Sequence, residues 1–232
     1  MINNKTVLGV ITARGGSVRL PKKNILNFSG KPLIAHTIEQ AKKSNYIDNI
    51  ICSTDSKEIK NIALNYNCSI PFMRPKYLAK NSTTSLDVLT HLCKKIKSYD
   101  YIILLQPTSP LRSTNDIDAA LEKCEKFNAF SVVSVNKLDK KTDLMFHLNK
   151  NNSLYVLDKY FLKVNKKSST KSVFLLNGAI YVLRHKNIMK NLPFVTKKTI
   201  AHIMPKNRSI DIDDEIDFLL AEILHKKSNF YA

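Results

Sequence analysis

A glycine-containing basic turn near the amino end of the chain has the residue types that bind phosphate. Gly15 and Gly16 let the backbone turn tightly and leave N–H groups accessible to an anion. This turn is surrounded by the positive charges of Arg14, Arg19, Lys22 and Lys23. The spacing matches neither a P-loop nor the GxGxxG pattern of dinucleotide-binding folds. We therefore expect the turn to bind a nucleoside triphosphate, and the alternative is an ordinary basic surface turn.

Two aspartates near the other end of the chain have the spacing of a metal site. Asp211 and Asp213 lie two residues apart in the run SIDID. In an extended segment, alternate residues point to the same side, so both carboxylates can bind one Mg²⁺ while Ile210 and Ile212 face the core. The alternative for Asp213 is an N-cap of the helix that follows. We expect the basic turn and the aspartates to meet around one magnesium nucleotide.

Polar side chains also follow a buried segment in the middle of the chain. Two prolines stiffen the run QPTSPLR, and its side chains Gln106, Ser109 and Arg112 are expected to bind substrate in the same crevice. Asn177, in the run NGAIY, places an amide at the entrance of a later strand and is expected to bind substrate too. The ordinary interpretation of the end of the first run is that Ser113 or Thr114 caps the helix that follows, and this is compatible with substrate binding.

Apolar runs and helical periodicity indicate the elements that position these residues. The apolar runs cover residues 7–11, 50–52, 101–105 and 129–135, and most are rich in β-branched residues. The segments between them have helical periodicity. This alternation predicts a Rossmann-like α/β fold of three layers, with a mainly parallel sheet between helices. Ligands of such sheets bind beyond the carboxyl ends of the strands.

The alternation stops near residue 137, and a lysine- and asparagine-rich stretch follows. Residues 145–148 and 154–157 are short apolar runs on either side of a turn, which predicts a hairpin. We expect residues 137–173 to form an inserted arm that packs on a second subunit, and the alternative is a surface loop. The α/β domain would then comprise residues 1–136 and 174–232, with a last helix from about residue 214 to 225.

Composition gives a strongly basic chain with no membrane signal. The 232 residues carry a formal net charge of +18, which fits an anionic small substrate or a nucleic acid. Much of the excess is scattered lysine, so we expect no nucleic-acid partner. The four cysteines show no CxxC spacing. Because no apolar run is long enough for a signal peptide or a membrane span, we expect a cytoplasmic protein without a membrane partner.

Taken together and in this order, the basic turn, QPTSPLR, NGAIY and SIDID resemble the acylneuraminate cytidylyltransferases, the synthetases of CMP-activated sialic acids. The resemblance spans residues 7 to about 224. It implies a Rossmann-like fold, the use of CTP and Mg²⁺, release of pyrophosphate, and a homodimer formed through an inserted arm. The expected partners are therefore CTP, an acidic sugar and a second copy of the chain.

The resemblance also implies roles for single residues. The positions that match the nucleotide-binding residues of the family are Arg14, Ser17, Lys23 and Asn24 for the phosphates and ribose, and Arg74 and Ser85 for the cytosine. Gln106 matches a sugar-binding position, and Asp211 and Asp213 match the metal-binding aspartates. We expect Arg14, Lys23 and Asp211 to be catalytic, since cations and the metal offset charge on the α-phosphate and the leaving pyrophosphate.

Two departures from the family pattern concern the acceptor sugar. The family usually has a lysine where Val18 stands, and Arg19 is expected to supply that cation and bind nucleotide. Family arginines that receive the sugar's carboxylate or side chain are replaced by Lys167 and Leu175. We therefore expect a related nonulosonic acid of the legionaminic or pseudaminic type rather than N-acetylneuraminate. The alternatives are an eight-carbon acid such as 3-deoxy-manno-octulosonate, a sugar phosphate, or, more distantly, nucleic-acid binding.

Overall fold

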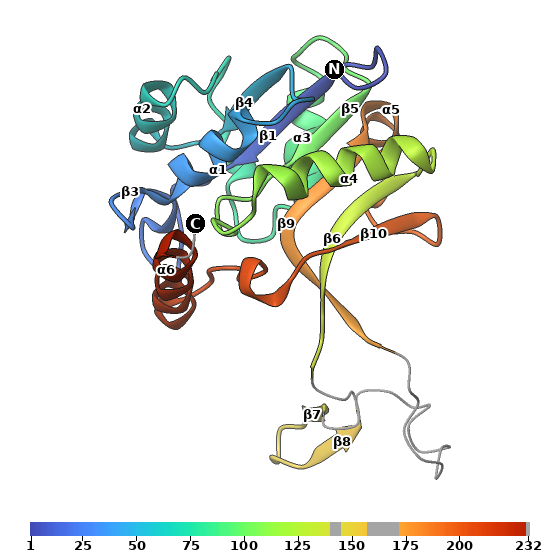
Figure 1. Ribbon diagram of the computed structural model, residues 1–232. Coiled ribbons are helices and arrows are strands. Elements are labelled where there is room, and N and C mark those ends of the chain that lie inside the picture. Colours follow the sequence, from blue (N-terminus) through green and yellow to red (C-terminus); the bar gives the residue numbers. More distant parts are fainter. Residues whose placement is uncertain (140–144, 157–171, 231–232) are drawn as a thin grey trace.

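A six-stranded sheet forms the centre of the computed structural model, which describes residues 1–139, 145–156 and 172–230 (Figure 1). The strand order is β10-β6-β9-β5-β1-β4. The strands are β1 (Val7–Thr12), β4 (Asn49–Ser53), β5 (Tyr101–Leu104), β6 (Ser131–Lys137), β9 (Phe174–Arg184) and β10 (Thr199–Ile203). β1 pairs in parallel with β4 and β5, and β6 with β10, whereas β9 is antiparallel to both of its neighbours. The predicted α/β class with a mainly parallel sheet is confirmed.

Helices cover both faces of this sheet because alternate strand residues point to opposite sides. Val7 and Ile11 of β1 belong to the core beneath α1 (Leu33–Lys42), α2 (Lys57–Asn65) and α4 (Thr114–Lys126). Leu8 and Val10 belong to the core beneath α3 (Ser85–Cys93) and α5 (His185–Met189). Side chains buried on both faces explain why the strands read as continuous apolar runs. The result is the three-layer arrangement that the sequence predicts.

Smaller elements complete the α/β unit. They are the short strands β2 (Asn27–Phe28) and β3 (Lys31–Pro32) and the 3₁₀ turns η1 (Lys23–Ile25), η2 (Lys76–Leu78) and η5 (Lys206–Arg208). The closing helix α6 (Glu215–Phe230) is longer than the predicted segment 214–225. It packs through Phe218 and Ala221 on Phe28 and Leu33, in a third core cluster that also contains Ile212. Because Ile212 of the aspartate segment and Leu20 of the basic turn both pack in this cluster, it holds the two segments close together.

The β6–β9 ribbon extends beyond the sheet and leads toward a separate hairpin (Figure 1). Pairing continues to Lys137 and Phe174, and the N–H of Leu138 donates to the carbonyl of Val173 at 2.8 Å. The hairpin consists of β7 (Phe146–Leu148) and β8 (Leu154–Val156), as the sequence predicts. Residues 140–144 and 157–171 of the expected arm lie outside the described residues. Packing of the arm on a second subunit stays a prediction.

The cysteines form no disulfide among the described residues, in line with their sequence spacing. All four cysteines are buried and unpaired, and burial raises the pKa of the Cys52 and Cys68 thiols. Within the described ranges, no helix combines the length and the apolar character that crossing a bilayer requires.

Candidate active site

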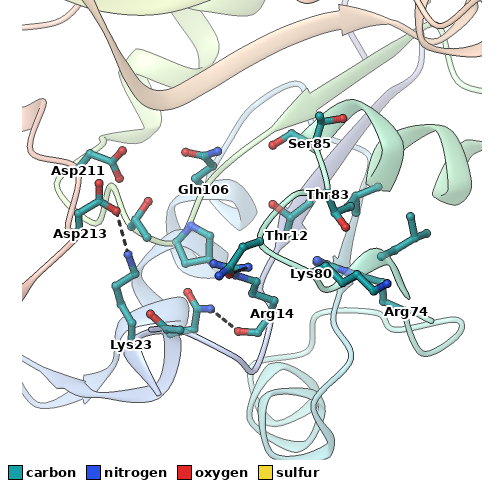
Figure 2. A pocket seen from close by; sticks show the side chains of 18 residues that line it. Thr12, Arg14, Lys23, Arg74, Lys80, Thr83, Ser85, Gln106, Asp211 and Asp213 are labelled. Atoms are coloured by element: carbon teal, nitrogen blue, oxygen red, sulfur yellow. Dashed lines mark hydrogen bonds and ion pairs between the residues drawn. The ribbon is translucent and has the colours of Figure 1, made fainter. Parts of the chain in front are cut away.

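A cavity of about 360 Å³ opens beyond the carboxyl ends of β1 and β5, where ligands of such sheets bind (Figure 2). Its lining is mainly polar and comes from five separate stretches of the chain. The lining residues are Thr12, Arg14, Ser17, Lys23, Asn24, Arg74, Leu78, Lys80, Asn81, Thr83, Thr84, Ser85, Val88, Gln106, Pro107, Thr108, Asp211 and Asp213. We call this cavity the cleft.

The basic turn and the two aspartates meet in the cleft, as the sequence predicts. Lys23 Nζ donates to the carbonyl of Ile212 at 2.6 Å and lies 3.3 Å from Asp213 Oδ1. The guanidinium of Arg19 lies 2.7 Å from the other oxygen of Asp213. These contacts join residues that are about 190 positions apart in the chain. Cations and carboxylates therefore face one space, which suits a phosphate group bridged to a metal ion.

Local backbone geometry explains how the turn presents its side chains. β1 ends at Thr12, and Lys22 adopts a left-handed conformation (φ 55°) before η1, which directs Lys23 toward the aspartates. The buried Asn24 side chain donates to the carbonyl of Arg14 at 3.0 Å and thereby closes the turn. Arg14 in turn donates to Asn81 Oδ1 at 2.6 Å. The side chains of Arg14 and Lys23 consequently reach the cleft from opposite ends of the turn.

The sequence indicates that the backbone amides of Gly15 and Gly16 bind phosphate, but the structure gives these glycines other surroundings. The N–H of Gly15 donates to Asp55 Oδ1 at 2.9 Å, so this amide is already satisfied by the protein. A Cβ at Gly15 would come within 3.0 Å of the Ser56 Cβ, whereas Gly16 has open space around it. Neither glycine lines the cleft. A side chain at Gly15 would therefore crowd the residue that caps α2, and direct phosphate binding by the Gly15 amide does not follow from the geometry.

The other end of the cleft has a partly apolar wall that suits a planar base. Leu78 and Val88 supply apolar surface, and Ser85 is the first residue of α3. Arg74 is buried, donates to Ser53 Oγ at 3.1 Å and also to the Ser53 carbonyl. Burial lowers the pKa of the Arg74 guanidinium, although the nearby Asp55 opposes this effect. A fixed cation and a hydroxyl beside an apolar wall are the features that bind a polar heterocycle.

The Asp211 carboxylate lines the cleft beside Asp213. Its Oδ1 atom is buried and has no hydrogen-bond partner among the described residues. Burial raises the pKa of Asp211, and so does the neighbouring charge of Asp213. Gly178 approaches so closely that a Cβ there would lie 3.1 Å from Asp211 Oδ2. Within the described residues, no third Asp, Glu, His or Cys joins these two carboxylates in a possible metal cluster. Such a pair fits Mg²⁺, which usually takes one or two carboxylates and completes its shell with water and substrate phosphates.

Asp213 is not the cap of α6. The N–H of Asp217 donates to Asp214 Oδ1 at 3.0 Å, and Asp217 Oδ2 accepts from the N–H of Asp213 at 2.9 Å. Asp214 and Asp217 thus satisfy the start of the helix. The Asp213 side chain remains half exposed and faces the cleft.

Three of the four residues expected to bind substrate lie elsewhere. Gln106 lines the cleft, but the side chains of Ser109, Arg112 and Asn177 are buried outside it. Arg112 is 2% exposed and donates to the carbonyl of Ala179 at 2.8 Å, and burial lowers its pKa to about 9. The expectation of substrate contact is corrected for these three residues. These side chains instead hold the QPTSPLR and NGAIY segments together. The prediction failed because a polar side chain at the end of a strand can point into the protein as readily as into a ligand site.

Sequence reasoning missed several cleft residues between η2 and α3 and within QPTSPLR. Lys80, Asn81 and Thr83 belong to the first group, and Thr108 belongs to the second. The first group could have been found from its position in the sequence, directly before Ser85, which was already expected to bind cytosine. The signal for Thr108 was its place between the two prolines.

The chain is similar to known proteins over nearly its whole length. Residues 8–213 match the family profile described as cytidylyltransferase. The CMP-N,N'-diacetyllegionaminic acid synthase of Legionella pneumophila is 36% identical over 223 residues, which cover 94% of this chain and 95% of the relative. A pseudaminic acid cytidylyltransferase of Campylobacter jejuni is 33% identical over 223 residues, with coverage of 94% and 96%. A solved structure of CMP:2-keto-3-deoxy-manno-octonic acid synthetase complexed with CTP has a TM-score of 0.74 at 16% identity, covers 96% of this chain and 99% of its own, and shows the shared fold.

Proposed function

Because the chain belongs to the cytidylyltransferase family, we propose that it transfers CMP from CTP to the anomeric hydroxyl of a sialic-acid-like nonulosonic acid and releases pyrophosphate. The observation that carries this proposal is that Lys23, Asp211 and Asp213 line one cleft, where Lys23 pairs with Asp213. Arg19, which is not part of the lining, pairs with the same carboxylate. The rest of the cleft offers the apolar and polar wall that a base requires.

The nucleotide is proposed to lie along the cleft, with cytosine at one end and phosphates at the other. The base would lie between Leu78 and Val88 and receive hydrogen bonds from Arg74 and Ser85. Arg14 and Ser17 line the same cavity, so the triphosphate would extend past them toward Lys23. Charge-assisted hydrogen bonds from Arg14 and Lys23 favour a polyanion over a neutral ligand.

A magnesium ion is proposed to bind to Asp211 and Asp213. The unpartnered Oδ1 of Asp211 and the half-exposed carboxylate of Asp213 are compatible with such an ion. When bound, the ion would offset negative charge on the phosphates and orient them. Since Lys23 and Arg19 contact Asp213, these cations balance the acidic segment and remain close to the phosphates.

The chain's own residues contribute positioning and charge stabilisation. The Lys23 ammonium is held by the Ile212 carbonyl, so it is fixed close to where charge develops on the phosphate oxygens. The side-chain oxygen of Gln106 lies beside Gly178 and Asp211 and can accept a hydrogen bond from a sugar hydroxyl. Fixing the hydroxyl and the α-phosphate in line makes the attack effectively intramolecular.

The acceptor is proposed to be of the legionaminic or pseudaminic type. Two relatives that are named for these acids match the chain over nearly its full length. Leu175, where the family resemblance implies an arginine, is apolar and 56% exposed on β9. Lys167, the other changed position, lies outside the described residues. An eight-carbon ulosonic acid is the second candidate, favoured by the shared fold of the octulosonate enzyme.

The test is pyrophosphate release from each of the four nucleoside triphosphates with a panel of acidic sugars. The panel contains legionaminic, pseudaminic and N-acetylneuraminic acids, 3-deoxy-manno-octulosonate, and sugar 1-phosphates. We expect turnover only with CTP, and the highest kcat/KM with a legionaminic or pseudaminic acid. Turnover of UTP or GTP with a sugar 1-phosphate, and none of CTP with any ulosonic acid, would overturn the proposal.

A homodimer is proposed to form through the arm. Exposed apolar side chains gather directly before β9, on its first residues and on the hairpin, namely Val173, Phe174, Leu175, Leu176, Leu148 and Leu154. Exposed apolar surface of this kind marks an interaction site. Light scattering should give twice the chain mass, and Leu176→Asp should shift the protein toward monomer. We also propose a cytoplasmic location, where CTP is available, and cell fractionation tests it.

A further inference from the structure

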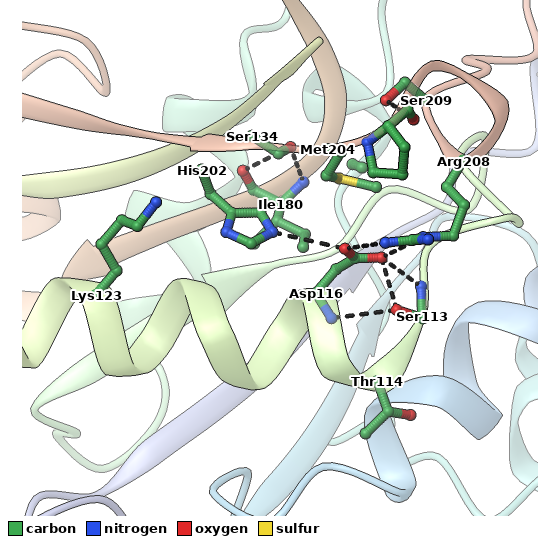
Figure 3. Close-up of polar contacts among 12 residues, drawn as sticks. Ser113, Thr114, Asp116, Lys123, Ser134, Ile180, His202, Met204, Arg208 and Ser209 are labelled. Atoms are coloured by element: carbon green, nitrogen blue, oxygen red, sulfur yellow. Dashed lines mark hydrogen bonds and ion pairs between the residues drawn. The ribbon is translucent and has the colours of Figure 1, made fainter.

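An ion pair between the buried Asp116 and the partly exposed Arg208 lies at the start of α4 (Figure 3). Asp116 is 5% exposed, and its two oxygens accept from Nε and Nη2 of Arg208 at 3.0 and 2.9 Å. The N–H and hydroxyl of Ser113 donate to the same carboxylate at 3.0 and 2.6 Å, and the His202 Nε2 atom lies 3.6 Å from it. The carboxylate is therefore held in one orientation, and it holds Arg208 by two parallel bonds.

Arg208 is the last residue of η5 and stands three positions before Asp211. The chain after it is anchored again at Ile212, whose N–H donates to the carbonyl of Thr108 at 2.8 Å and whose carbonyl accepts from Lys23. Between these anchors, Ser209 Oγ accepts from the Asn177 amide at 3.0 Å. Asp211 thus lies on a short segment that is fixed on both sides.

Neither member of the ion pair lines the cleft. Any effect of the pair on the chemistry must therefore pass through the backbone of residues 208–213. A bidentate guanidinium fixes both the distance and the direction of that backbone, whereas a lysine ammonium makes a single, freely rotating contact. Asp116 itself is fixed by the capping box of α4, so the reference point is a rigid helix rather than a loop.

We propose that the Asp116–Arg208 pair is a positioning device that sets the place of Asp211 and Asp213 in the cleft. This inference rests on the proposed function, because it assigns the pair to the metal-binding segment of that site. The pair would act on the step in which the metal and the α-phosphate are aligned. It would contribute little to the binding of the base, since Arg74 and Ser85 reach the cleft from other parts of the chain.

The test compares Arg208→Lys with wild type and with a matched control, Arg184→Lys. Arg184 ends β9 at the amino end of β5, and donates to the Ala129 carbonyl and to Asn128 at 3.0 and 2.7 Å. It is thus another structural arginine with two bonds, far along the strand from the cleft. Three quantities are measured for each protein: kcat, the half-saturating Mg²⁺ concentration, and the Kd for CTP in EDTA.

For Arg208→Lys we expect kcat to fall at least about 10-fold and the half-saturating Mg²⁺ concentration to rise several-fold, because small misplacements of a reacting group are costly. The Kd for CTP in EDTA should stay within about twofold of wild type, since the base and the cationic turn are untouched. Arg184→Lys should leave all three quantities unchanged. Melting curves establish that each variant is folded at the assay temperature.

The inference is overturned if folded Arg208→Lys keeps the wild-type kcat and Mg²⁺ response. It is also overturned if the Kd for CTP in EDTA worsens as much as kcat, which would mean general loosening of the cleft. Should Arg208→Lys not fold, Asp116→Asn is judged by the same criteria. Wild type without CTP-dependent turnover on any ulosonic acid would instead contradict the proposed function, so the two failures are distinguishable.

Discussion

Replacing Gly178 by alanine should damage the site far more than the fold. Gly178 has φ of +71°, and a Cβ there would lie 2.7 Å from Gln106 Oε1 and 3.1 Å from Asp211 Oδ2. Ordinary contact begins at 3.4 Å, so the first distance is about 0.7 Å too short. Asp211 cannot retreat freely because its segment is anchored at Arg208 and Ile212. The added methyl group must therefore displace Gln106, Asp211, or both.

The Gly178→Ala substitution should lower both the stability of the fold and the rate of the reaction. A left-handed backbone costs an L-residue about 1–2 kcal/mol, which lowers the melting temperature of a chain of this size by about 2–8 °C. Misplacing a reacting or positioning group by about 1 Å can cost about 100-fold in rate. Since the displacement here is about 0.7 Å, we expect kcat/KM to fall by at least about 10-fold.

Gly30→Ala is the matched control for this prediction. Gly30 also has a positive φ, of +93°, but a Cβ there meets nothing within 4 Å. Both variants should lose stability to a similar extent in thermal melts, and only Gly178→Ala should lose turnover in the pyrophosphate assay. Wild-type kcat/KM in folded Gly178→Ala would refute the reasoning, because the contacts of Gln106 and Asp211 with Gly178 would then be irrelevant to the reaction.

Three further predictions concern single side chains. The Asp211→Asn variant should have no turnover and should melt at or above the wild-type temperature. Burial raises the pKa of Asp211, which shows that its charge is unfavourable in the fold, and the substitution removes that charge. A melting temperature well below that of wild type would contradict this. Ser85→Ala should raise the KM for CTP with little change in kcat, because its hydroxyl faces the base end of the cleft; steady-state kinetics at saturating sugar checks it. Burial lowers the pKa of His36 from 6.5 to about 4, with the bond to Phe28 opposing, so the unfolded chain binds more protons than the folded one between these values. Stability should therefore fall by up to ~3 kcal/mol as pH drops from about 6.5 to 4, and urea unfolding of His36→Gln should show a weaker pH dependence.

The strands and the sheet class could be predicted because burial on both faces leaves continuous apolar runs, as at residues 101–105 and 129–135. The antiparallel direction of β9 was not predicted. Direction is set by how the chain crosses between distant strands, and no local residue records it. The first residues of β9, from Phe174 to Leu176, were not predicted to be strand, because they are exposed apolar side chains next to a lysine-rich stretch.

Some residues of the site could likewise be predicted from the sequence, and others could not. Lys23 and Asp213 could be predicted as partners because each stands at an element end on the expected ligand side of the sheet. Arg112 could not be distinguished from Gln106, since both follow the same strand and only the packed structure shows that the guanidinium turns inward to Thr37 and Ala179. The Gly15 amide was assigned to phosphate because its partner, Asp55, lies 40 positions away in the sequence.

The central claim is that the basic turn and the twin aspartates hold one metal-bound CTP. A crystal grown with CTP and Mn²⁺, with anomalous data that locate the metal, tests this claim most directly. The account predicts a manganese peak in contact with Asp211 and Asp213, phosphates between it and Lys23, and cytosine against Arg74 and Ser85. Manganese remote from both aspartates, or cytosine at the Lys23 end of the cleft, would contradict it.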